Sequence, residues 1–185
     1  MIPEKIKAIR LLLGITETQV SNIIFMNSYK YKRSEKDIAY LSTENLVLLS
    51  LIYKVPLEKI LFTEYSVEDI VNDEYLNSLE GLEKEQIEVI LKDNLCSYFV
   101  SKRNKTNSTT VDLIIKNERR IFRDNLKSLR ESRELDVPQM AELLGIDTVE
   151  YSRLENSSSL PKPYQLMEFI KKLEIQLTDL IMLTK

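Results

Sequence analysis

A cluster of positively charged side chains in the first third of the chain is the group best suited to bind another molecule. Three cations and a tyrosine follow Ser28 within five residues, at Tyr29, Lys30, Lys32 and Arg33. Arginine can donate two parallel hydrogen bonds to guanine, and lysine can bind guanine or a phosphate. These residue types are therefore suited to contact DNA if one surface presents them together. A basic helix face that is only solvated is the alternative interpretation.

The elements that hold this cluster are indicated by an internal repeat. Residues 6–62 align with residues 126–182 without a gap, and eight of the 57 positions are identical. Apolar residues also coincide in kind, as Val20 does with Met140. Self-similarity at a fixed offset predicts two copies of one small helical domain. The identical pairs are Lys7 and Lys127, Arg10 and Arg130, Gln19 and Gln139, Tyr31 and Tyr151, Arg33 and Arg153, Glu35 and Glu155, Leu46 and Leu166, and Leu57 and Leu177.

The second copy carries the clearer helix signals. Apolar residues at three- and four-residue spacing from Phe122 predict an amphipathic helix that ends near Arg133. Asp136 can cap the next short helix, and Gly145 can adopt the positive φ that a tight turn between two helices requires. Two short helices joined in this way form a helix-turn-helix. The segments expected to be helical are 138–144, 148–156 with Asp147 as its cap, 164–175 and, as a last turn or helix, 177–183.

A sparse set of residues in this copy follows a known pattern: an arginine on the first helix, an apolar pair on the second, a turn glycine, a Glu-Asn pair that ends the third helix, and a downstream proline. Together with the helix spacing, they resemble the phage-repressor type of helix-turn-helix DNA-binding domain, also called Cro-like or xenobiotic-response-element type, over residues 126–181. The matching residues are Arg130, Met140, Ala141, Gly145, Glu155, Asn156 and Pro161.

The chain departs from this family at several positions. Where the family commonly has a phosphate-binding glutamine at the start of the second helix, this chain has Val137, which would weaken contact with DNA. Ser157 replaces the glycine that commonly follows the Glu-Asn pair. In the first copy Phe25 replaces the turn glycine, although Thr16 keeps the capping position.

The resemblance implies an all-α protein with two lambda-repressor-like helix-turn-helix bundles. A degenerate bundle is expected at residues 1–65 and a second one at residues 118–185, joined by an acidic and mainly helical region at residues 66–117.

The resemblance also implies two ion pairs that join the first helix of each copy to the end of its third helix. Arg10 would pair with Glu35, and Arg130 with Glu155. Removing one member of such a pair leaves a buried charge uncompensated, at a cost of about 3–5 kcal/mol. We therefore expect these four residues to support the fold and not to contact a ligand.

The third helix of such a bundle fits the major groove, and its exposed side chains reach base edges and phosphates. In the second copy Thr148 and Val149 could touch a thymine methyl group, and Arg153 could bind guanine or a phosphate, whereas Glu150 would repel the backbone unless it accepts from cytosine. The alternative is a retained fold that serves packing or protein contact. The candidate DNA-binding residues are Ser28, Tyr29, Lys30, Lys32 and Arg33, with Tyr31 turned inward, and Thr148, Val149, Ser152 and Arg153, with Tyr151 turned inward.

Charge along the chain favours the first copy as the binding site. The whole chain has a net charge of −3. Residues 1–62 carry nine Lys and Arg against six Asp and Glu, residues 63–117 carry six against eleven, and residues 118–185 carry eleven against twelve. A locally basic surface can attract phosphates even when the whole molecule is mildly acidic.

Composition argues against several classes of protein. The chain has no histidine, which excludes histidine triads and histidine metal ligands, and it lacks a phosphate-cradling glycine loop and a metal-ligand cluster. We therefore expect neither an enzyme nor a cofactor or metal site. Cys96 is the single cysteine, which fits a reducing cytoplasm, and the apolar run near the N-terminus is too short for a signal peptide or a membrane span.

The acidic region predicts one long amphipathic helix at residues 83–100, with apolar residues at roughly helical spacing. Its apolar stripe must be buried against the terminal domains or against a second chain. Residues 101–110 are expected to form a polar loop. Because residues 96–100 and 109–115 are rich in strand formers, a β-hairpin around this loop is an alternative.

These observations lead us to expect a sequence-specific DNA-binding transcriptional regulator, a repressor of phage or mobile-element type. Its partner would be double-stranded DNA, bound either by a homodimer that reads a palindrome or by two unlike readers within one chain. The alternative is a protein-interaction module with helix-turn-helix folds, such as an antirepressor, an antitoxin or a nuclease inhibitor. Val137, Phe25, Glu150 and the acidic middle region favour that alternative.

Overall fold

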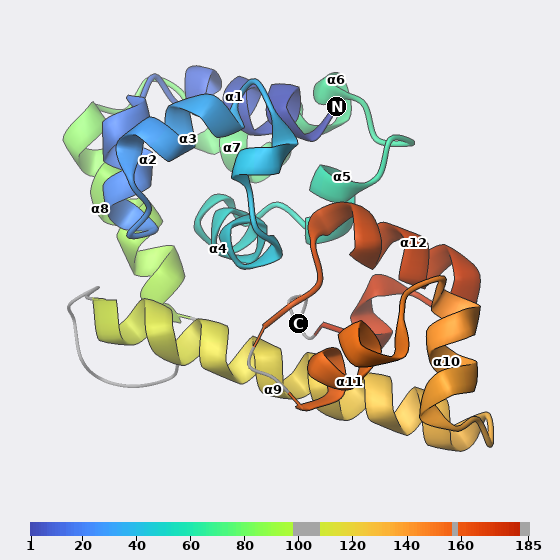
Figure 1. Ribbon diagram of the computed structural model, residues 1–185. Coiled ribbons are helices and arrows are strands. Elements are labelled where there is room, and N and C mark those ends of the chain that lie inside the picture. The colour runs from blue at the N-terminus through green and yellow to red at the C-terminus, as the bar shows by residue number, and fades with distance from the viewer. Residues whose placement is uncertain (98–107, 157–158, 182–185) are drawn as a thin grey trace. The chain divides into compact units, whose positions relative to one another are not determined.

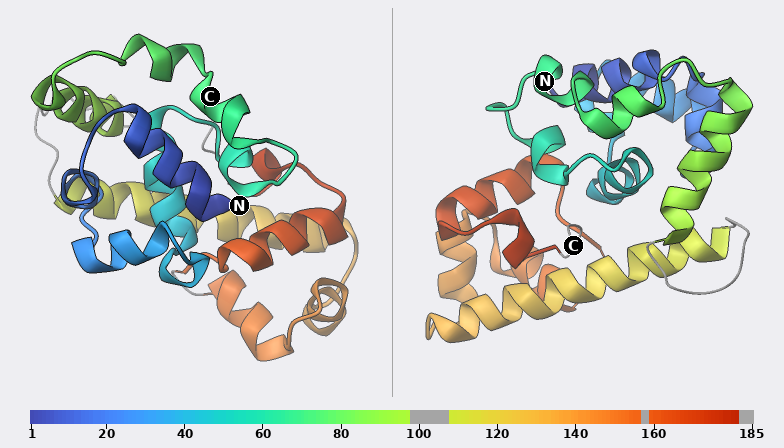
Figure 2. Two further views of the ribbon diagram at one scale, coloured as in Figure 1. Left: turned by 90° about the horizontal axis from the view of Figure 1, so that it is seen from above. Right: turned by 180° about the vertical axis from the view of Figure 1, so that it is seen from behind.

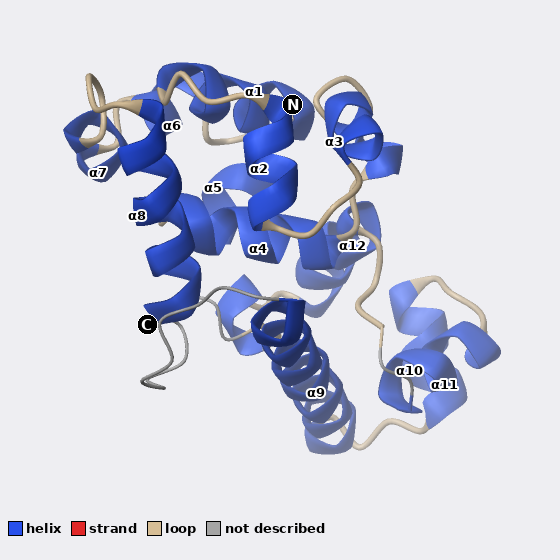
Figure 3. Cartoon of the chain, turned by 90° about the vertical axis from the view of Figure 1, so that its left-hand side faces the viewer, coloured by secondary structure: helices blue, strands red, loops and turns tan. Residues whose placement is uncertain are grey.

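The protein is all-α: in the computed structural model, which describes residues 1–97, 108–156 and 159–181, every regular element is a helix (Figures 1 and 3). Contacts divide the chain into two units, Met1–Ile114 and Ile115–Lys185. Where the sequence indicated three segments, the helices of the acidic region therefore belong to the same unit as the first copy.

The first unit begins with the helices of the first copy and continues into those of the acidic region. Its core is built around α4, which is apolar on nearly all sides and therefore needs partners all around it. In Figures 1 and 2, α4 lies between α8 and α5. The helices are α1 (Ile2–Leu12), α2 (Glu17–Ile23), α3 (Ser28–Ser34), the 3-10 helix η1 (Ile38–Tyr40), α4 (Thr43–Tyr53), α5 (Leu57–Leu61), α6 (Val67–Val71), α7 (Glu74–Ser78) and α8 (Lys84–Ser97).

Helix α8 is the amphipathic helix expected in the acidic region, and it packs on α4 and α2 of its own chain. Its buried residues include Leu91 and Leu95, both 0% exposed. The Asn94 side chain also donates a hydrogen bond of 2.7 Å to the Ile52 carbonyl near the end of α4. Ile87, Leu91 and Leu95 of the apolar stripe are thus buried within the first unit, whereas Leu82 is 38% exposed.

The β-hairpin alternative is wrong, because Thr109–Ile115 lies inside α9 (Ser108–Ser132). Strand-forming residues can occupy a helix when most of their apolar members fall on one face: Val111, Ile114 and Ile115 do so here and are buried, whereas Leu113 is 52% exposed. The expected polar loop also ends earlier than residue 110, since α9 begins at Ser108. Residues 98–107, which include the end of the expected helix and most of that loop, lie outside the described residues.

The second unit contains most of α9 and the three helices that follow it. Figure 2 shows α9 as one long continuous helix. Phe122 and Leu126 on α9, Met140 on α10 and Leu166 on α12 are all 0% exposed and form the centre of the core. The remaining elements are α10 (Val137–Leu144), α11 (Thr148–Asn156), α12 (Pro163–Leu173) and the 3-10 helix η2 (Leu177–Asp179).

The offset of 120 residues is present in the backbone as well as in the sequence. Helices α2, α3, α4 and α5 begin 120 residues before α10, α11, α12 and η2. Both short second helices begin with the same capping box, formed by Thr16 with Gln19 and by Asp136 with Gln139. Positive φ values recur at the same offset, and the pairs are Gly14 and Glu134, Phe25 and Gly145, and Lys54 and Glu174.

The two copies differ most on the outer side of α4 and α12. Leu48 and Ile52 of α4 are 2% and 0% exposed, because α8 and other helices of the first unit cover α4. The corresponding residues of α12 are Glu168 and Lys172, and both are exposed. This exchange of apolar for charged residues accounts for the extra helices in the first unit.

Phe25 and Gly145 provide a matched test of the turn between the two short helices. Phe25 has a φ of 53° and is 50% exposed, so its backbone is strained in the left-handed region while its ring is only half-buried. We expect Phe25→Gly to raise the free energy of unfolding by about 0.5–1 kcal/mol, because relief of that strain exceeds the entropic cost of glycine. Gly145→Ala should lower it by about 1–2 kcal/mol, since its Cβ would also displace the Lys172 ammonium, which donates to the Leu144 carbonyl. Urea denaturation of both variants measures the two changes in the free energy of unfolding. Changes of the same sign would contradict the assignment of Phe25 and Gly145 to the same left-handed turn position.

Candidate nucleic-acid interface

Helix α3 is held by its inner side and presents its other residues to solvent. The Asn27 side chain caps the helix by accepting the Lys30 backbone N–H at 3.1 Å. Tyr31 and Ser34 face inward and are both 0% exposed. The Ser34 hydroxyl donates to the Tyr31 carbonyl at 2.6 Å. Both ends and the inner side of α3 are therefore fixed, which leaves its outer side as a preformed surface.

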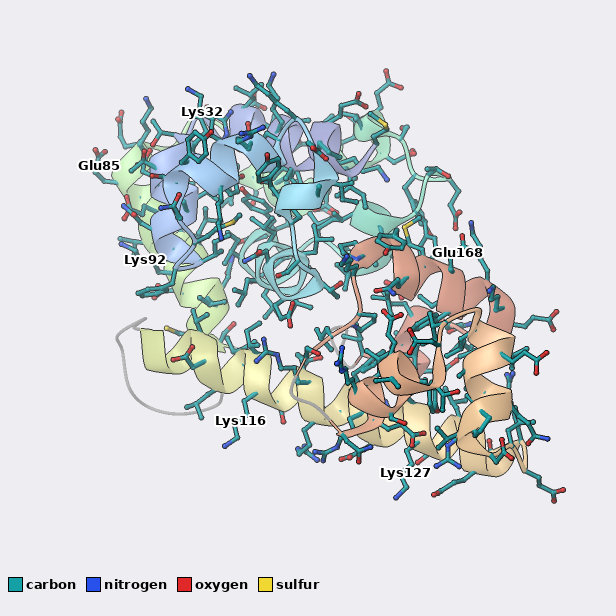
Figure 4. The ribbon with its side chains drawn as sticks, viewed as in Figure 1. Lys32, Glu85, Lys92, Lys116, Lys127 and Glu168 are labelled. Carbon is teal, nitrogen blue, oxygen red and sulfur yellow. The ribbon has the colours of Figure 1, made fainter. Side chains whose placement is uncertain are left out.

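All five candidate residues of the first copy lie on this outer side. Tyr29 is 64% exposed, and the other four are also exposed. Figure 4 labels Lys32 on α3 at the surface of the first unit. We call Ser28, Tyr29, Lys30, Lys32 and Arg33 the α3 ridge. The structure leaves all five residues that the sequence indicated exposed on α3, spread over about 200° of the helix circumference.

Arg33 is positioned by two aromatic rings. Its Nη1 donates a hydrogen bond of 3.0 Å to the Tyr29 hydroxyl, and its guanidinium carbon lies 5.7 Å from the centre of the Tyr29 ring. The guanidinium also lies 4.4 Å from the centre of the Tyr40 ring, on η1. The hydrogen bond to Tyr29 raises the pKa of Arg33. Sequence reasoning missed Tyr40, because no spacing rule connects η1 to α3.

Acidic groups lie next to the ridge on the side of α2. Glu17, the first residue of α2, lies 3.7 Å from Arg10 and is 38% exposed in its side chain. A hydrogen bond from its own backbone amide lowers the pKa of Glu17, and Arg10 and Lys32 act in the same direction. Glu88 of α8 accepts a hydrogen bond of 3.3 Å from the Gln19 side chain. These carboxylates reduce the positive potential near the start of α2.

Both expected ion pairs are present, with the same hydrogen-bonding pattern. Arg10 binds Glu35 through Nε at 2.5 Å and Nη2 at 2.8 Å, and its Nη1 donates to the Ile15 carbonyl at 3.0 Å. The side chains of Arg10 and Glu35 are only 8% and 5% exposed. Each pair joins the first helix of its copy to the end of the third, and so sets the tilt of the third helix.

The second copy repeats this arrangement with one added hydrogen bond. Arg130 binds Glu155 at 2.8 and 3.2 Å and donates to the Leu135 carbonyl at 3.1 Å. The Tyr151 hydroxyl also donates to Glu155, at 2.6 Å. Burial raises the pKa of Glu155, but the hydrogen bonds from Arg130 and Tyr151 outweigh that effect. The pKa of Glu155 therefore lies below its ordinary value. In the first copy the Tyr31 hydroxyl instead lies near that of Tyr53, without a hydrogen bond of good geometry.

The outer side of α11 is much less basic than the α3 ridge. Thr148, Val149 and Arg153 are exposed, with Val149 at 61%, and Ser152 is half-buried. Glu150, which we expected to repel a phosphate backbone, accepts a hydrogen bond of 2.7 Å from the Gln165 side chain of α12. That bond holds the Glu150 carboxylate towards α12.

Comparison with protein-family models, curated protein sequences and solved structures finds no match to this chain. In the part of the chain that the structure describes, no three acidic or cysteine side chains are grouped so that they could hold a metal ion. No helix among those residues has both the length and the apolar composition needed to cross a bilayer.

Proposed function

We propose that this chain is a sequence-specific DNA-binding transcriptional regulator, and that the α3 ridge is its principal reader. The observation that carries the proposal is that Tyr31 and Ser34 anchor one side of α3, while Tyr29, Lys30, Lys32 and Arg33 are exposed to solvent around the rest of the helix. An α-helix with its side chains is about 10–12 Å in diameter and fits a major groove about 12 Å wide. Lys30, Lys32 and Arg33 would then contact guanine edges and phosphates.

We also propose that the chain contains two lambda-repressor-like helix-turn-helix bundles. The first consists of α1 to α5, and the second of the C-terminal part of α9 with α10, α11, α12 and η2. Support comes from the shared capping boxes, the shared left-handed turn and the two Arg–Glu pairs. The sequence resemblance to phage repressors points to repression as the outcome of binding.

The two readers of one chain are unlike in charge. The α3 ridge carries three cations, whereas Arg153 is the one cation that α11 contributes, and Thr148 and Val149 suit apolar contact with a thymine methyl group. A single chain would therefore favour an asymmetric site with a tight half and a weak half. A homodimer would place two α3 ridges on the two halves of a palindrome.

Selection of bound DNA from a fragmented genome tests this proposal directly. The purified full chain is incubated with fragments at about 150 mM salt, where sequence-independent binding is weak, and the recovered fragments are sequenced. We expect a few fragments with a shared motif to be enriched. Uniform recovery, or recovery of nothing even at low salt, would contradict the function.

The second candidate function is a protein-interaction module. Glu17 corresponds to Val137, so neither copy has the phosphate-binding glutamine at the start of its second helix, and the first copy has a carboxylate there. Glu88 adds a second negative charge next to α2. This candidate gains support if the genome selection recovers no DNA and the α3 ridge is instead protected from labelling by a bound protein.

A further inference from the structure

The cations of the second unit are concentrated on one helix. Residues 115–133, which are the α9 part of this unit and the residue after it, carry seven Lys and Arg against three Asp and Glu. Residues 134–185, which include α11, carry five against nine. The part of this unit that attracts phosphates most strongly is therefore α9 and not α11.

Four of these cations share one side of α9. Their spacing of four, three and four residues places them within about 60° of the helix circumference and along about 16 Å of its axis. Figure 4 shows Lys116 and Lys127 pointing away from the helix on the same side. Arg120, Arg123 and Lys127 are 58%, 40% and 56% exposed in their side chains, and Lys116 is exposed too. We call Lys116, Arg120, Arg123 and Lys127 the α9 stripe.

The opposite side of α9 is apolar and buried, which orients the stripe. Phe122 and Leu126 are 0% exposed and pack into the core of the second unit. The apolar face of α9 is therefore already occupied within the unit. An amphipathic helix that binds a membrane surface needs that face free to enter the lipid.

The acidic residues beside the stripe only partly neutralise it. Asp124 accepts from Arg123 at 2.9 Å and lies 3.5 Å from Arg120, and Glu131 lies 3.8 Å from Lys127. Exposed ion pairs of this kind contribute little and are screened by salt. Asp112 is also exposed, one turn before Lys116, so the four cations face three acidic residues and keep a net positive charge.

We infer that the α9 stripe binds the phosphate backbone of double-stranded DNA without reading its sequence. Duplex DNA carries one negative charge per about 1.7 Å of its axis, so a straight row of cations about 16 Å long can neutralise several phosphates at once. The stripe has a regular line of positive charge and no exposed apolar residue between its members, which suits a charged backbone. This surface goes beyond the proposed function, which assigns sequence reading to α3, and it does not depend on that function.

The test compares three full-length variants, each with three cations replaced by glutamine, which keeps helix propensity. The stripe variant is Lys116→Gln, Arg120→Gln and Lys127→Gln, with Arg123 kept to hold Asp124. The ridge variant is Lys30→Gln, Lys32→Gln and Arg33→Gln. The control variant replaces Lys7, Lys84 and Lys171, which are exposed on α1, α8 and α12. Circular dichroism and thermal melting establish that each variant is folded like the wild type.

Fluorescence anisotropy then measures binding to a duplex of arbitrary sequence over a range of salt concentrations. The stripe variant should bind this duplex on the order of tenfold more weakly at about 100 mM salt. The slope of the logarithm of affinity against the logarithm of salt concentration should be shallower by about two to three, because two to three phosphate contacts are lost. The control variant should match the wild type. A variant that exchanges lysine and arginine at the same three stripe positions should recover the affinity, because it keeps the charge.

The inference and the proposed function fail in different ways. If the stripe variant binds duplex like the wild type, the inference is overturned, whatever the ridge variant does. If the stripe variant loses affinity for the arbitrary duplex while the ridge variant binds its selected duplex like the wild type, the inference holds and α3 is not the reader. Binding of the wild type to anionic vesicles but not to duplex would also overturn the inference, in favour of a membrane surface.

Discussion

Replacing Arg10 with methionine is expected to lower the free energy of unfolding of the first unit by about 3–5 kcal/mol. The substitution keeps most of the side-chain volume but removes three hydrogen bonds and leaves Glu35, which is 5% exposed in its side chain, as an unpaired buried charge. Urea denaturation measures the loss. Amide hydrogen exchange locates it, since protection in α1, α3 and α4 should fall while that in α10 to α12 should not.

The double variant Arg10→Met, Glu35→Leu separates the cost of an unpaired charge from the value of the pair. A buried ion pair replaced by apolar residues of similar volume is often neutral, so the double variant should regain most of the lost stability. Arg130→Met is the matched comparison in the second unit and should cost less, because Tyr151 still donates to Glu155. A cost below about 1 kcal/mol for Arg10→Met would show that the pair does not support the fold.

The ridge variant is expected to bind its selected DNA at least about 100-fold more weakly than the wild type at about 150 mM salt. It removes three positive charges together with the guanidinium that Tyr29 and Tyr40 position. Each lost phosphate contact makes the salt dependence shallower by about 0.9, so the slope should fall by about two to three. Titration of the selected duplex by anisotropy at several salt concentrations gives both quantities.

Two further variants show whether Arg33 acts through its geometry or only through its charge. Arg33→Lys keeps the charge but loses the two-pronged donor and stacks less well on Tyr40, so discrimination between cognate and altered duplexes should fall more than affinity for arbitrary DNA. Tyr40→Leu should act in the same direction and more weakly. The control variant should leave both kinds of binding unchanged. Equal loss of cognate and arbitrary binding in Arg33→Lys would assign Arg33 to a phosphate.

The sequence contained most of what places the candidate interface. The repeat, the capping residues and the Arg–Glu pairs are local or recur at one offset, so they could be read without coordinates. The left-handed turn at Phe25 could be inferred only through its partner Gly145, because phenylalanine itself gives no sign of a positive φ. The features of the first copy that align with the clearer second copy could therefore be predicted from the sequence.

Features that depend on contacts between distant segments were not predictable in the same way. Tyr40 meets Arg33, and Gln165 holds Glu150, through tertiary packing that no spacing rule describes. The packing of α8 on α4 did leave a signal, since Leu48 and Ile52 stand where the second copy has Glu168 and Lys172. Comparing the two copies for residues that differ in polarity, and not only for those that agree, would have located the surface that α8 covers.

The outer side of α4 also bears on how independent each half of the chain is. A bundle limited to residues 1–65 would expose Leu48, Ile52 and their neighbours to water, whereas the charged outer side of α12 is already suited to solvent. The two copies therefore differ in their packing: α12 exposes charged residues on its outer side, whereas the acidic helices cover α4. The first unit therefore holds a basic helix, α3, and the acidic helices that cover α4 in one packed body.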